Sequence, residues 1–284
     1  MKMFIEVFGK QIPLYGLMIV SGIALANVIA YFVVKKRKLD MNDLAIIEAF
    51  GGGMGFLGAK LMYLFVSIDV DWSRFFEKEY FEMLMSGGFV FYGGVLLGIP
   101  AAIWFGKINK INSFDYLRAL VFLIPFCHAF GRIGCFCAGC CYGVPYDGAI
   151  AVTFPLGTAP SLVEEISRYP VQLVEAGCLF LLAGILAFMD LKLKSRFTVE
   201  AYLILYAFIR FALENYRGDG IRGIYGPFST SQWVSIGMLA IGIGSIVLRL
   251  ILAKKKKEAA AADGTAAQSA QTEAVDSQVA EVNK

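Results

Sequence analysis

The stretch IPLYGLMIVSGIALANVIAYFVVKKRK, residues 12–38, decides the fold class. It is a long, predominantly apolar run that is followed at once by four basic residues. A helix needs about 20 mostly apolar residues to cross the hydrocarbon core of a bilayer. Lys2 and Lys10 are the only basic residues before the run, and Pro13 and Gly16 interrupt its start, which is unlike a cleavable signal peptide. We therefore expect a first transmembrane helix that remains in the mature protein.

Similar apolar runs recur along the rest of the chain. Of its 284 residues, 58% are hydrophobic and only 17% are charged, whereas soluble domains are about half apolar and about a quarter charged. We predict an all-α polytopic membrane protein with about seven transmembrane helices. The predicted spans are residues 12–34, 44–68, 87–106, 117–136, 171–189, 199–212 and 229–253.

The basic residues predict how these helices are oriented. The segments at one side of the predicted bundle, residues 35–38, 107–110, 192–196 and 249–257, hold fourteen basic residues, against seven on the other side. Because positive charge favours the cytoplasmic side, we expect the N-terminus outside and the C-terminus in the cytoplasm. The outer loops 69–86 and 142–170 would then form a small head.

The C-terminal segment 254–284 differs in composition from everything before it. It begins with four lysines and continues as a low-complexity stretch without aromatic residues. Such a sequence cannot bury enough apolar surface to fold, and clustered lysines favour the anionic inner leaflet. We therefore separate a transmembrane domain, residues 1–253, from a basic and then disordered cytoplasmic tail, residues 254–284.

Several ionisable side chains fall inside the predicted spans, where each costs about 2.5–3.5 kcal/mol at a helix centre. Such residues are candidates for function rather than for anchoring. They are Glu48, Lys60, His128, Arg132, Glu175, Arg210 and Glu214.

Two arginines are the strongest of these candidates. Tyr206, Arg210, Glu214 and Arg217 follow one another at steps of three or four and so share one helix face. Arg210 either forms an ion pair with Glu214 that fastens the helix, or is held by Glu214 and directed at a phosphate, which a planar guanidinium binds well. Arg132 lies between two glycines at a similar depth, so either it is structural or both arginines line a pocket for an anionic headgroup.

The segment HAFGRIGCFCAGCCYG, residues 128–143, contains four cysteines and the only histidine of the chain. A metal site would use the C-x-x-C pair Cys137 and Cys140, but no second such pair follows. A redox centre would use the same pair on the oxidising outer side, yet the outer loops hold no shuttling cysteine pair. Packing of small apolar thiols is the interpretation that we favour.

Several motifs, in order from about residue 12 to residue 250, resemble the prolipoprotein diacylglyceryl transferase family. They are LYGLM (14–18), GFLGAKLMY (55–63), GGFVFYGGVLLG (87–98), GRIGCFCAGCCYG (131–143), RYPVQLVE (168–175) and YAFIRFALENYR (206–217). The resemblance implies a bacterial plasma-membrane enzyme that moves a diacylglyceryl group from phosphatidylglycerol to the lipobox cysteine thiol of a prolipoprotein, with loss of glycerol phosphate. Residues 1–253 would be its transferase domain.

The resemblance also implies the partners and the site. The expected partners are phosphatidylglycerol, prolipoprotein signal peptides and membrane lipids, with no nucleic acid, no metal and no cofactor. The expected catalytic residues are Arg132, Arg210, Tyr92, Glu214 and His128. The expected substrate-binding residues are Tyr15, Lys60, Arg132, Gly134, Cys135, Cys140, Gly143, Gln172, Glu175, Tyr206 and Arg217.

The chain departs from the family pattern at several polar positions. Cys135 and Ala138 stand where the family has asparagine, Cys140 where it has glutamate, Tyr92 and Tyr169 where it has histidine, and Lys60 where it has arginine. His128, one helical turn before Arg132, is a candidate replacement for the missing histidine. The alternatives are a related transferase that uses the same lipid donor with another acceptor, and a membrane thiol–disulfide or metal protein that uses the cluster from Cys135 to Cys141.

Overall fold

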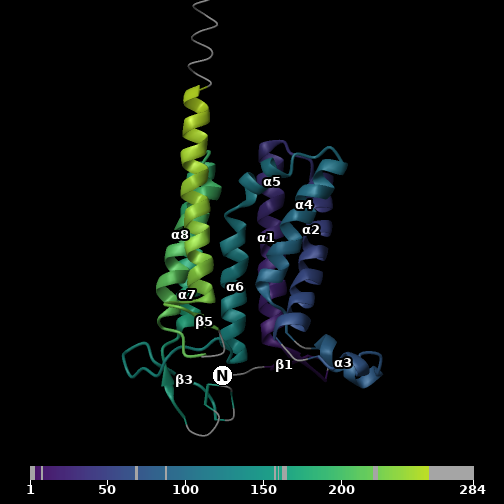
Figure 1. Ribbon diagram of the computed structural model, residues 1–284, viewed down its shortest axis with the longest axis vertical. Helices are drawn as coiled ribbons and strands as arrows, with labels where there is room; N and C mark the ends of the chain where they lie inside the picture. The colour runs from purple at the N-terminus through teal and green to yellow at the C-terminus, as the bar shows by residue number, and fades with distance from the viewer. Residues whose placement is uncertain are drawn as a thin grey trace, which may run out of the picture. The chain divides into compact units, whose positions relative to one another are not determined.

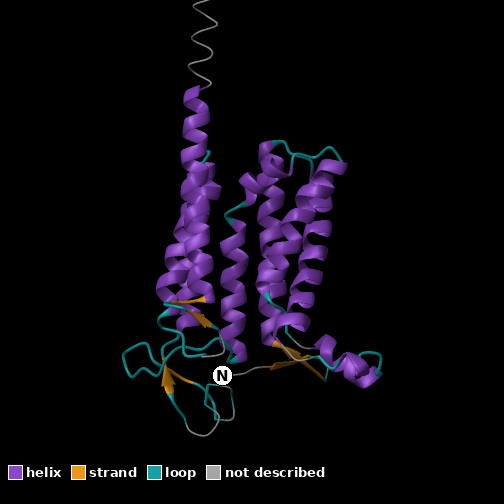
Figure 2. Cartoon of the chain, in the orientation of Figure 1, coloured by secondary structure: helices purple, strands orange, loops and turns teal. Residues whose placement is uncertain are grey.

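The computed structural model describes residues 4–7, 9–67, 70–86, 88–156, 158, 160–161, 165–219 and 223–255. Helices dominate the described chain, and the strands are short hairpins at helix ends (Figure 2). The prediction of a mostly helical protein is confirmed. The chain divides into two compact units, Met1–Thr198 and Val199–Lys284. The predicted disordered tail lies outside the described residues from 256 onward.

The first unit begins with an antiparallel hairpin, in which Phe4 of β1 pairs with Pro13 of β2. Long helices follow, joined by short connections and by one small hairpin, β3–β4, in which Val152 pairs with Arg168. Its elements are β1 (Phe4–Val7), β2 (Lys10–Pro13), α1 (Leu14–Arg37), α2 (Met41–Met62), a π-helical turn (Tyr63–Ser67), a 3₁₀ turn (Trp72–Arg74), α3 (Lys78–Ser86), α4 (Phe91–Ile108), α5 (Ser113–Leu120), α6 (Leu123–Ala138), β3 (Val152–Thr153), β4 (Ser167–Arg168) and α7 (Val171–Leu191).

Two sets of helix contacts hold the first unit together. Helix α6 packs against α1 on one side and α7 on the other, and α2 packs against α4 (Figure 1). The α2–α4 contact depends on glycine, because a Cβ added at Gly58 would overlap the Gly93 carbonyl and one added at Gly93 would overlap the Gly58 carbonyl. Small residues that let helix backbones approach closely are typical of packing inside membranes.

Each of the seven predicted apolar runs contains a helix, but the count of seven spans is not confirmed. In the described residues, four helices are long and apolar enough to cross a bilayer: Leu14–Arg37, Met41–Phe65, Val171–Leu191 and Thr230–Lys255. Helices α5 and α6 together make a fifth candidate that bends by 58°. The two remaining runs correspond to α4 and α8 (Thr198–Glu214), which are shorter helices.

The bend between α5 and α6 has a local cause. Pro125 lies in the first turn of α6, where it has no backbone N–H to continue a hydrogen-bond ladder from α5. The chain turns at Val121 and Phe122, and Ile124 N–H instead donates to the Val121 carbonyl at 3.1 Å. The predicted continuous span 117–136 is therefore two helices.

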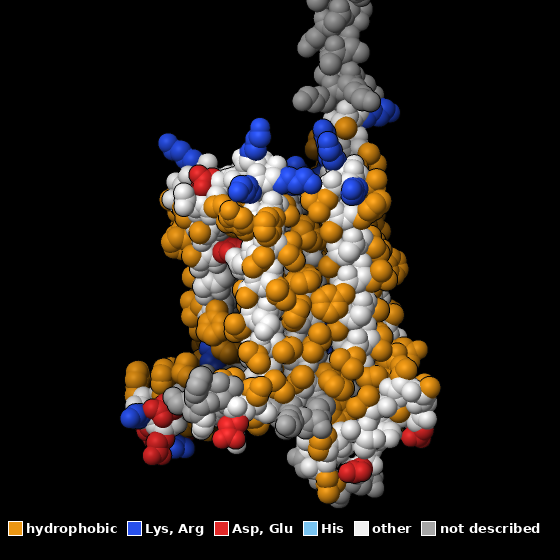
Figure 3. Space-filling view, turned by 180° about the vertical axis from the view of Figure 1, so that it is seen from behind, with side chains coloured by type: hydrophobic (Ala, Val, Ile, Leu, Met, Phe, Trp, Pro, Cys, Tyr) orange, Lys and Arg blue, Asp and Glu red, His pale blue; other side chains and the backbone are white. Residues whose placement is uncertain are grey.

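The surface of the first unit fits a bilayer environment. Large apolar side chains of α1, such as Val20, Val28 and Phe32, are exposed along the helix. Hydrophobic side chains cover the sides of the helices, and lysine and arginine side chains gather at the end that carries the α1–α2 and α4–α5 connections (Figure 3). The protein is therefore a membrane protein by the composition of its helix surfaces.

The second unit consists of α8 (Thr198–Glu214), a hairpin of β5 (Ile224–Tyr225) and β6 (Phe228–Ser229), and the helix Thr230–Lys255. A Cβ added at Gly242 would lie 2.8 Å from the Ile204 side chain, so the two helices touch closely there. Near the far end of the pair, buried Glu200 accepts a hydrogen bond from Ser245 at 3.1 Å and forms an ion pair with Arg249 at 3.0 Å. Polar contacts therefore hold the start of α8 against the C-terminal half of the helix Thr230–Lys255.

Candidate active site

An ion pair within the first unit joins α6 to α7. Arg132 Nη2 lies 2.9 Å from Glu175 Oε1, and the two side chains are only 11% and 1% exposed. An ionised pair inside apolar helices is costly unless it is compensated, and such residues usually mark functional sites in membrane proteins. The contact holds one end of the guanidinium, and the planar fork of arginine suits directional binding of a phosphate.

The chain reverses direction directly after α6 through a Schellman motif. Gly139 adopts a left-handed conformation with φ of 66°, its N–H donates to the Phe136 carbonyl, and Cys140 N–H donates to the Cys135 carbonyl, both at 3.1 Å. The Cys140 thiol also contacts the Cys135 carbonyl, with a sulfur–oxygen distance of 3.6 Å. The motif therefore stacks Cys140 on the last turn of α6, one turn beyond Arg132.

Helix α7 supports this turn from the other side. Gln172, in the first turn of α7, is 1% exposed, and its Nε2 donates to the Cys140 carbonyl at 2.9 Å. Glu175 lies three residues further along the same helix and reaches Arg132. One face of α7 therefore holds both the arginine and the cysteine turn.

Helix α1 approaches the same region at Gly134. A Cβ added at Gly134 would lie 3.1 Å from both the backbone carbonyl oxygen and the ring of Tyr15. A Cβ added at Gly131, on the other side of Arg132, would meet nothing within 4 Å. The backbones of α1 and α6 therefore approach closely at Gly134.

Arg168 orders the loop that follows the cysteines. Its Nε donates to the Pro160 carbonyl at 2.7 Å, its Nη1 donates to the Gly143 carbonyl at 3.2 Å, and its guanidinium lies 4.6 Å from the centre of the Tyr142 ring. Gly143 therefore contributes its backbone carbonyl, which accepts a hydrogen bond from Arg168. We did not identify Arg168 from the sequence as a site residue, although it opens the RYPVQLVE motif.

Lys60 contacts the connection between α3 and α4. Its Nζ donates to the carbonyls of Met85 and Gly88, at 3.0 and 3.5 Å, and lies 4.8 Å from the centre of the Phe89 ring. These contacts tie α2 to the connection between α3 and α4. Tyr92 follows in α4, but its side chain lies outside the described residues. Its predicted catalytic role stays a prediction.

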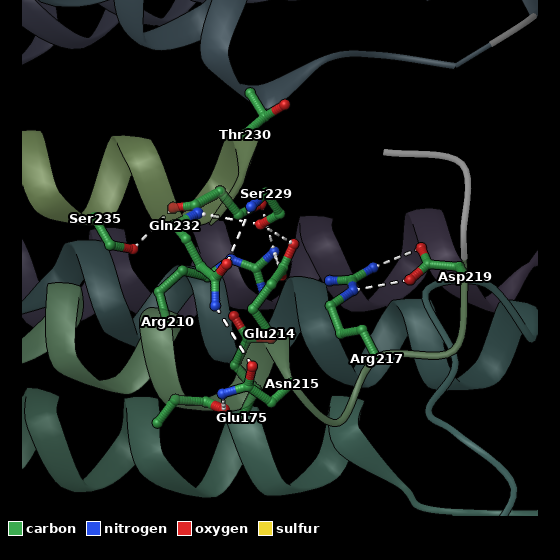
Figure 4. A network of polar contacts seen from close by, with 12 residues as sticks. Glu175, Arg210, Glu214, Asn215, Arg217, Asp219, Ser229, Thr230, Gln232 and Ser235 are labelled. Atoms are coloured by element: carbon green, nitrogen blue, oxygen red, sulfur yellow. Dashed lines mark hydrogen bonds and ion pairs between the residues drawn. The ribbon is translucent and has the colours of Figure 1, made fainter. Parts of the chain in front are cut away.

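The second unit contains the other predicted arginine, in a buried polar network (Figure 4). Arg210 Nη2 donates to the Ser231 hydroxyl at 2.8 Å and lies 2.6 Å from Glu214 Oε2. The Ser229 hydroxyl donates to the other Glu214 oxygen at 2.8 Å. The ion pair between Arg210 and Glu214, one of the two interpretations of this stripe, is therefore formed.

A capping box formed by Ser229 and Gln232 positions Ser229 and the nearby Ser231. Ser229 N–H donates to the Gln232 side chain at 3.0 Å, and Gln232 N–H donates to the Ser229 hydroxyl at 3.2 Å. This reciprocal pattern starts the helix Thr230–Lys255. The start of the helix therefore fixes the partners of both Arg210 and Glu214.

The remaining predicted residues of the second unit also have partners. Arg217 makes a bidentate pair with Asp219, at 2.9 and 2.7 Å. Tyr206 is buried and stacks on Tyr202, with ring centroids 5.7 Å apart. The prediction that Arg132 and Arg210 share one pocket concerns residues of two different units and stays a prediction.

The first unit thus brings together most of the residues predicted within it. Those that converge around the end of α6 are Tyr15, Arg132, Gly134, Cys135, Cys140, Gly143, Gln172 and Glu175. His128 lies one turn before Arg132 on α6. Cys141, which was predicted as part of the cysteine cluster but not as a substrate-binding residue, belongs to the same group. The Cys140-Cys141 dipeptide was the only signal of it in the sequence.

The sequence matches the family model for prolipoprotein diacylglyceryl transferase over residues 2–248. The chain belongs to this family. A relative from Clostridium tetani, named phosphatidylglycerol–prolipoprotein diacylglyceryl transferase, is 35% identical over 245 residues, which cover 84% of this chain and 93% of the relative. A relative of the same name from Clostridioides difficile is 27% identical over 254 residues, which cover 88% of this chain and 94% of the relative. Membership of the prolipoprotein diacylglyceryl transferase family makes the protein a transferase.

Proposed function

We propose that the protein transfers the diacylglyceryl group of phosphatidylglycerol to the lipobox cysteine thiol of prolipoproteins and releases glycerol phosphate. The named relatives carry both substrates in their names. The observation in the molecule that carries the proposal is the buried Arg132–Glu175 pair. A fixed, buried guanidinium beside an apolar surface fits the phosphate of a lipid whose acyl chains stay in the bilayer.

The reaction requires that the acceptor thiol is deprotonated and that the leaving phosphate is stabilised. The acceptor thiol gives up its proton and its sulfur attacks the terminal glyceryl carbon, while the carbon–oxygen bond to phosphate breaks and its electron pair stays on the phosphate oxygen. Negative charge therefore grows on the leaving phosphate. Arg132 is the residue that we assign to stabilise this charge, because a preorganised cation acts most strongly where water is excluded.

Other predicted residues receive supporting roles in the same proposal. Arg210, which forms an ion pair with Glu214, keeps its predicted role of binding the lipid phosphate. Arg217, Tyr206 and Lys60 are assigned to the walls of the lipid site. His128, one turn from Arg132 on α6, is our candidate to accept the thiol proton. Tyr92, at a position where the family has histidine, keeps its predicted role as a catalytic residue.

We further propose that the protein resides in the bacterial plasma membrane, with the end of α6 on the outer side. The concentration of basic residues in the segments 35–38, 107–110, 192–196 and 249–257 supports this orientation. A prolipoprotein signal peptide would then meet the site from the side on which it emerges.

A second acceptor class is favoured by one observation. Cys135, Ala138 and Cys140 replace polar residues of the family motif next to Arg132. A related transferase could therefore use phosphatidylglycerol with a different acceptor, and the assay below separates the two functions.

The test uses the full chain in membranes, labelled phosphatidylglycerol, and a lipobox peptide with cysteine or with serine at the acceptor position. We expect label on the cysteine peptide alone. Arg132→Ala should lower transfer by about 100-fold or more, as loss of a charge-stabilising donor does. Arg74→Ala is the matched control, since Arg74 forms an exposed pair with Glu77. Lipid turnover without labelled peptide would favour the second acceptor class, and no turnover at all would contradict both.

A further inference from the structure

Three thiols converge at the end of α6. The Sγ atoms of Cys135, Cys140 and Cys141 all lie within 4.8 Å of one another, and each residue is partly exposed. Cys137, which the C-x-x-C spacing would pair with Cys140, is not a member of this group. The metal alternative that the sequence suggested therefore involves a different set of cysteines, and this set is complete without a second C-x-x-C pair.

The backbone holds the three thiols in place. The Schellman motif at Gly139 carries Cys140 back over Cys135, as described above. Cys141 then adopts a left-handed conformation with φ of 56°. A residue with a side chain rarely takes this conformation, and such residues concentrate at functional sites. Together, the two left-handed residues of the turn place Cys140 and Cys141 on the same side as Cys135.

The spacing of the sulfurs suits a thiophilic metal ion. With zinc–sulfur bonds of about 2.3 Å in tetrahedral geometry, neighbouring sulfurs lie about 3.8 Å apart, so the cluster needs to close by at most about 1 Å. Thiolate ligands select Zn²⁺ or Cu⁺ over hard cations. Catalytic zinc sites have three protein ligands and leave the fourth position open, and three cysteines at a partly exposed helix end match that arrangement.

A second observation points to a ligand at this place. Gln172 is buried and its Nε2 is bound to the Cys140 carbonyl, but its Oε1 is buried without a hydrogen-bond partner among the described residues. Buried acceptors in this state are rare and require an explanation. An N–H or O–H of a molecule bound beside the cysteine turn would satisfy this oxygen.

We propose that Cys135, Cys140 and Cys141 bind one Zn²⁺ ion, and that its open position takes the acceptor thiol as a thiolate. The metal site stands on the cysteine geometry, whereas the role of the fourth position rests on the function proposed above. A thiol that coordinates zinc loses its proton, which is the activation that a thiol nucleophile needs near neutral pH.

The group transfer then balances in the following way. The zinc-bound thiolate forms the sulfur–carbon bond, the carbon–oxygen bond to phosphate breaks, and the electron pair of that bond remains on glycerol phosphate. The proton lost from the thiol passes to His128, the candidate acceptor named above, and from there to solvent. Zinc is neither oxidised nor reduced, and no further reactant is consumed. Arg132, one turn before the cysteine cluster, would face the leaving phosphate.

The first test measures metal binding without any assay of activity. The full chain in detergent micelles is reduced, stripped with a chelator and titrated with Zn²⁺ or with the spectroscopic probe Co²⁺. We expect one ion per chain and, with Co²⁺, the absorption of a tetrahedral thiolate site. Each of Cys135→Ser, Cys140→Ser and Cys141→Ser should weaken binding by more than about 100-fold, because a residue bonded to the ion matters more than one that only orients such a residue.

The chain offers matched controls for these variants. Cys127 and Cys178 are also partly exposed helix cysteines, but they lie outside the cluster. Cys127→Ser and Cys178→Ser should therefore bind Zn²⁺ as the unchanged chain does. Weak binding by the unchanged chain, or equal loss in Cys178→Ser and Cys140→Ser, would overturn the site. Circular dichroism identifies any variant that fails to fold. The zinc affinities of the two other cysteine variants then decide whether the site exists.

The second test asks what occupies the fourth position. Adding the cysteine lipobox peptide to the Co²⁺-loaded chain should strengthen the thiolate charge-transfer band, whereas the serine peptide should leave it unchanged. An unchanged spectrum with both peptides, or full transfer by the chelated chain, would refute zinc activation while leaving the proposed transferase intact. Tight zinc binding with a peptide response but no lipid transfer would instead refute the proposed function and leave the metal site standing.

Discussion

Arg132 on α6 and Glu175 on α7 form an ion pair at 2.9 Å in which the glutamate side chain is 1% exposed. The pair links two helices that also carry Cys135 and Gln172, so it couples helix packing to the geometry of the candidate site. If the pair only packs the helices, substitutions should change stability alone. If Arg132 also binds phosphate, they should change lipid transfer as well, and single and double substitutions separate the two cases.

We expect Glu175→Ala to destabilise the protein strongly. Removing the carboxylate leaves a buried guanidinium without its counter-charge, which costs about 3–5 kcal/mol in comparable buried pairs. Thermal unfolding in detergent micelles measures this loss. Glu77→Ala, which removes the acid of the exposed pair with Arg74, should change the melting temperature little. Equal effects of the two substitutions would contradict the special status of Glu175.

The double variant Arg132→Met with Glu175→Leu separates stability from activity. Apolar residues of similar volume often replace a buried ion pair at no cost in stability. We therefore expect unfolding close to that of the unchanged chain but no lipid transfer. If the stable double variant still transferred lipid, Arg132 would be a packing residue only.

Gly134→Ala should impair the protein, whereas Gly131→Ala should not. The methyl group added at Gly134 would lie 3.1 Å from the Tyr15 backbone, which cannot yield without moving α1. Such overpacking costs about 1–3 kcal/mol. At Gly131 the methyl group meets nothing, and alanine in a helix is more favourable by roughly 0.5–1 kcal/mol. Unfolding measurements on both variants test the difference, and a reversed order would contradict the close α1–α6 contact.

The same comparison applies to the contact between α2 and α4. Gly58→Ala would drive its methyl group into the Gly93 carbonyl, whereas Gly53→Ala on the same helix meets nothing within 4 Å. We expect Gly58→Ala to lower the yield of folded protein and its melting temperature, and Gly53→Ala to leave both nearly unchanged. Size-exclusion chromatography and thermal unfolding measure the two effects. Normal folding of Gly58→Ala would show that the helices can separate at little cost.

Ser231→Ala should destabilise the second unit more than Ser235→Ala. The Ser231 hydroxyl accepts a hydrogen bond from buried Arg210, and such bonds to charged groups contribute about 1.5–3 kcal/mol. The equally buried Ser235 hydroxyl donates to the Ser231 carbonyl within its own helix. Because the two serines lie one turn apart, their comparison controls for helix position. Equal unfolding temperatures would contradict the contribution assigned to Arg210.

Sequence reasoning located the helices because long apolar runs are a strong signal for membrane segments. It did not find the break between α5 and α6, although Pro125 is the visible cause. The pairing of Arg210 with Glu214 followed from their spacing on one helix. Arg132 and Glu175 were both predicted as site residues, but nothing in the spacing could pair them, because their contact depends on how α6 packs against α7.

In the cysteine cluster too, sequence spacing did not predict which side chains lie together. The spacing C-x-x-C indicated Cys137 and Cys140, whereas Cys137 still belongs to α6 and is not a member of the group at the turn. The left-handed residues Gly139 and Cys141 decide which thiols meet. Glycine after a helix predicts such a turn, but a left-handed cysteine has no sequence signal.

The turn after α6 also has a consequence for how the site can arise and be moved. All three thiols belong to the contiguous segment 135–141, and its internal hydrogen bonds run from Gly139 and Cys140 back to the last turn of the same helix. A short insertion or exchange at one helix end is therefore enough to add or remove the whole thiol group. Transplanting this segment onto the corresponding helix of a relative would carry its chemistry along, without redesign of the surrounding bundle.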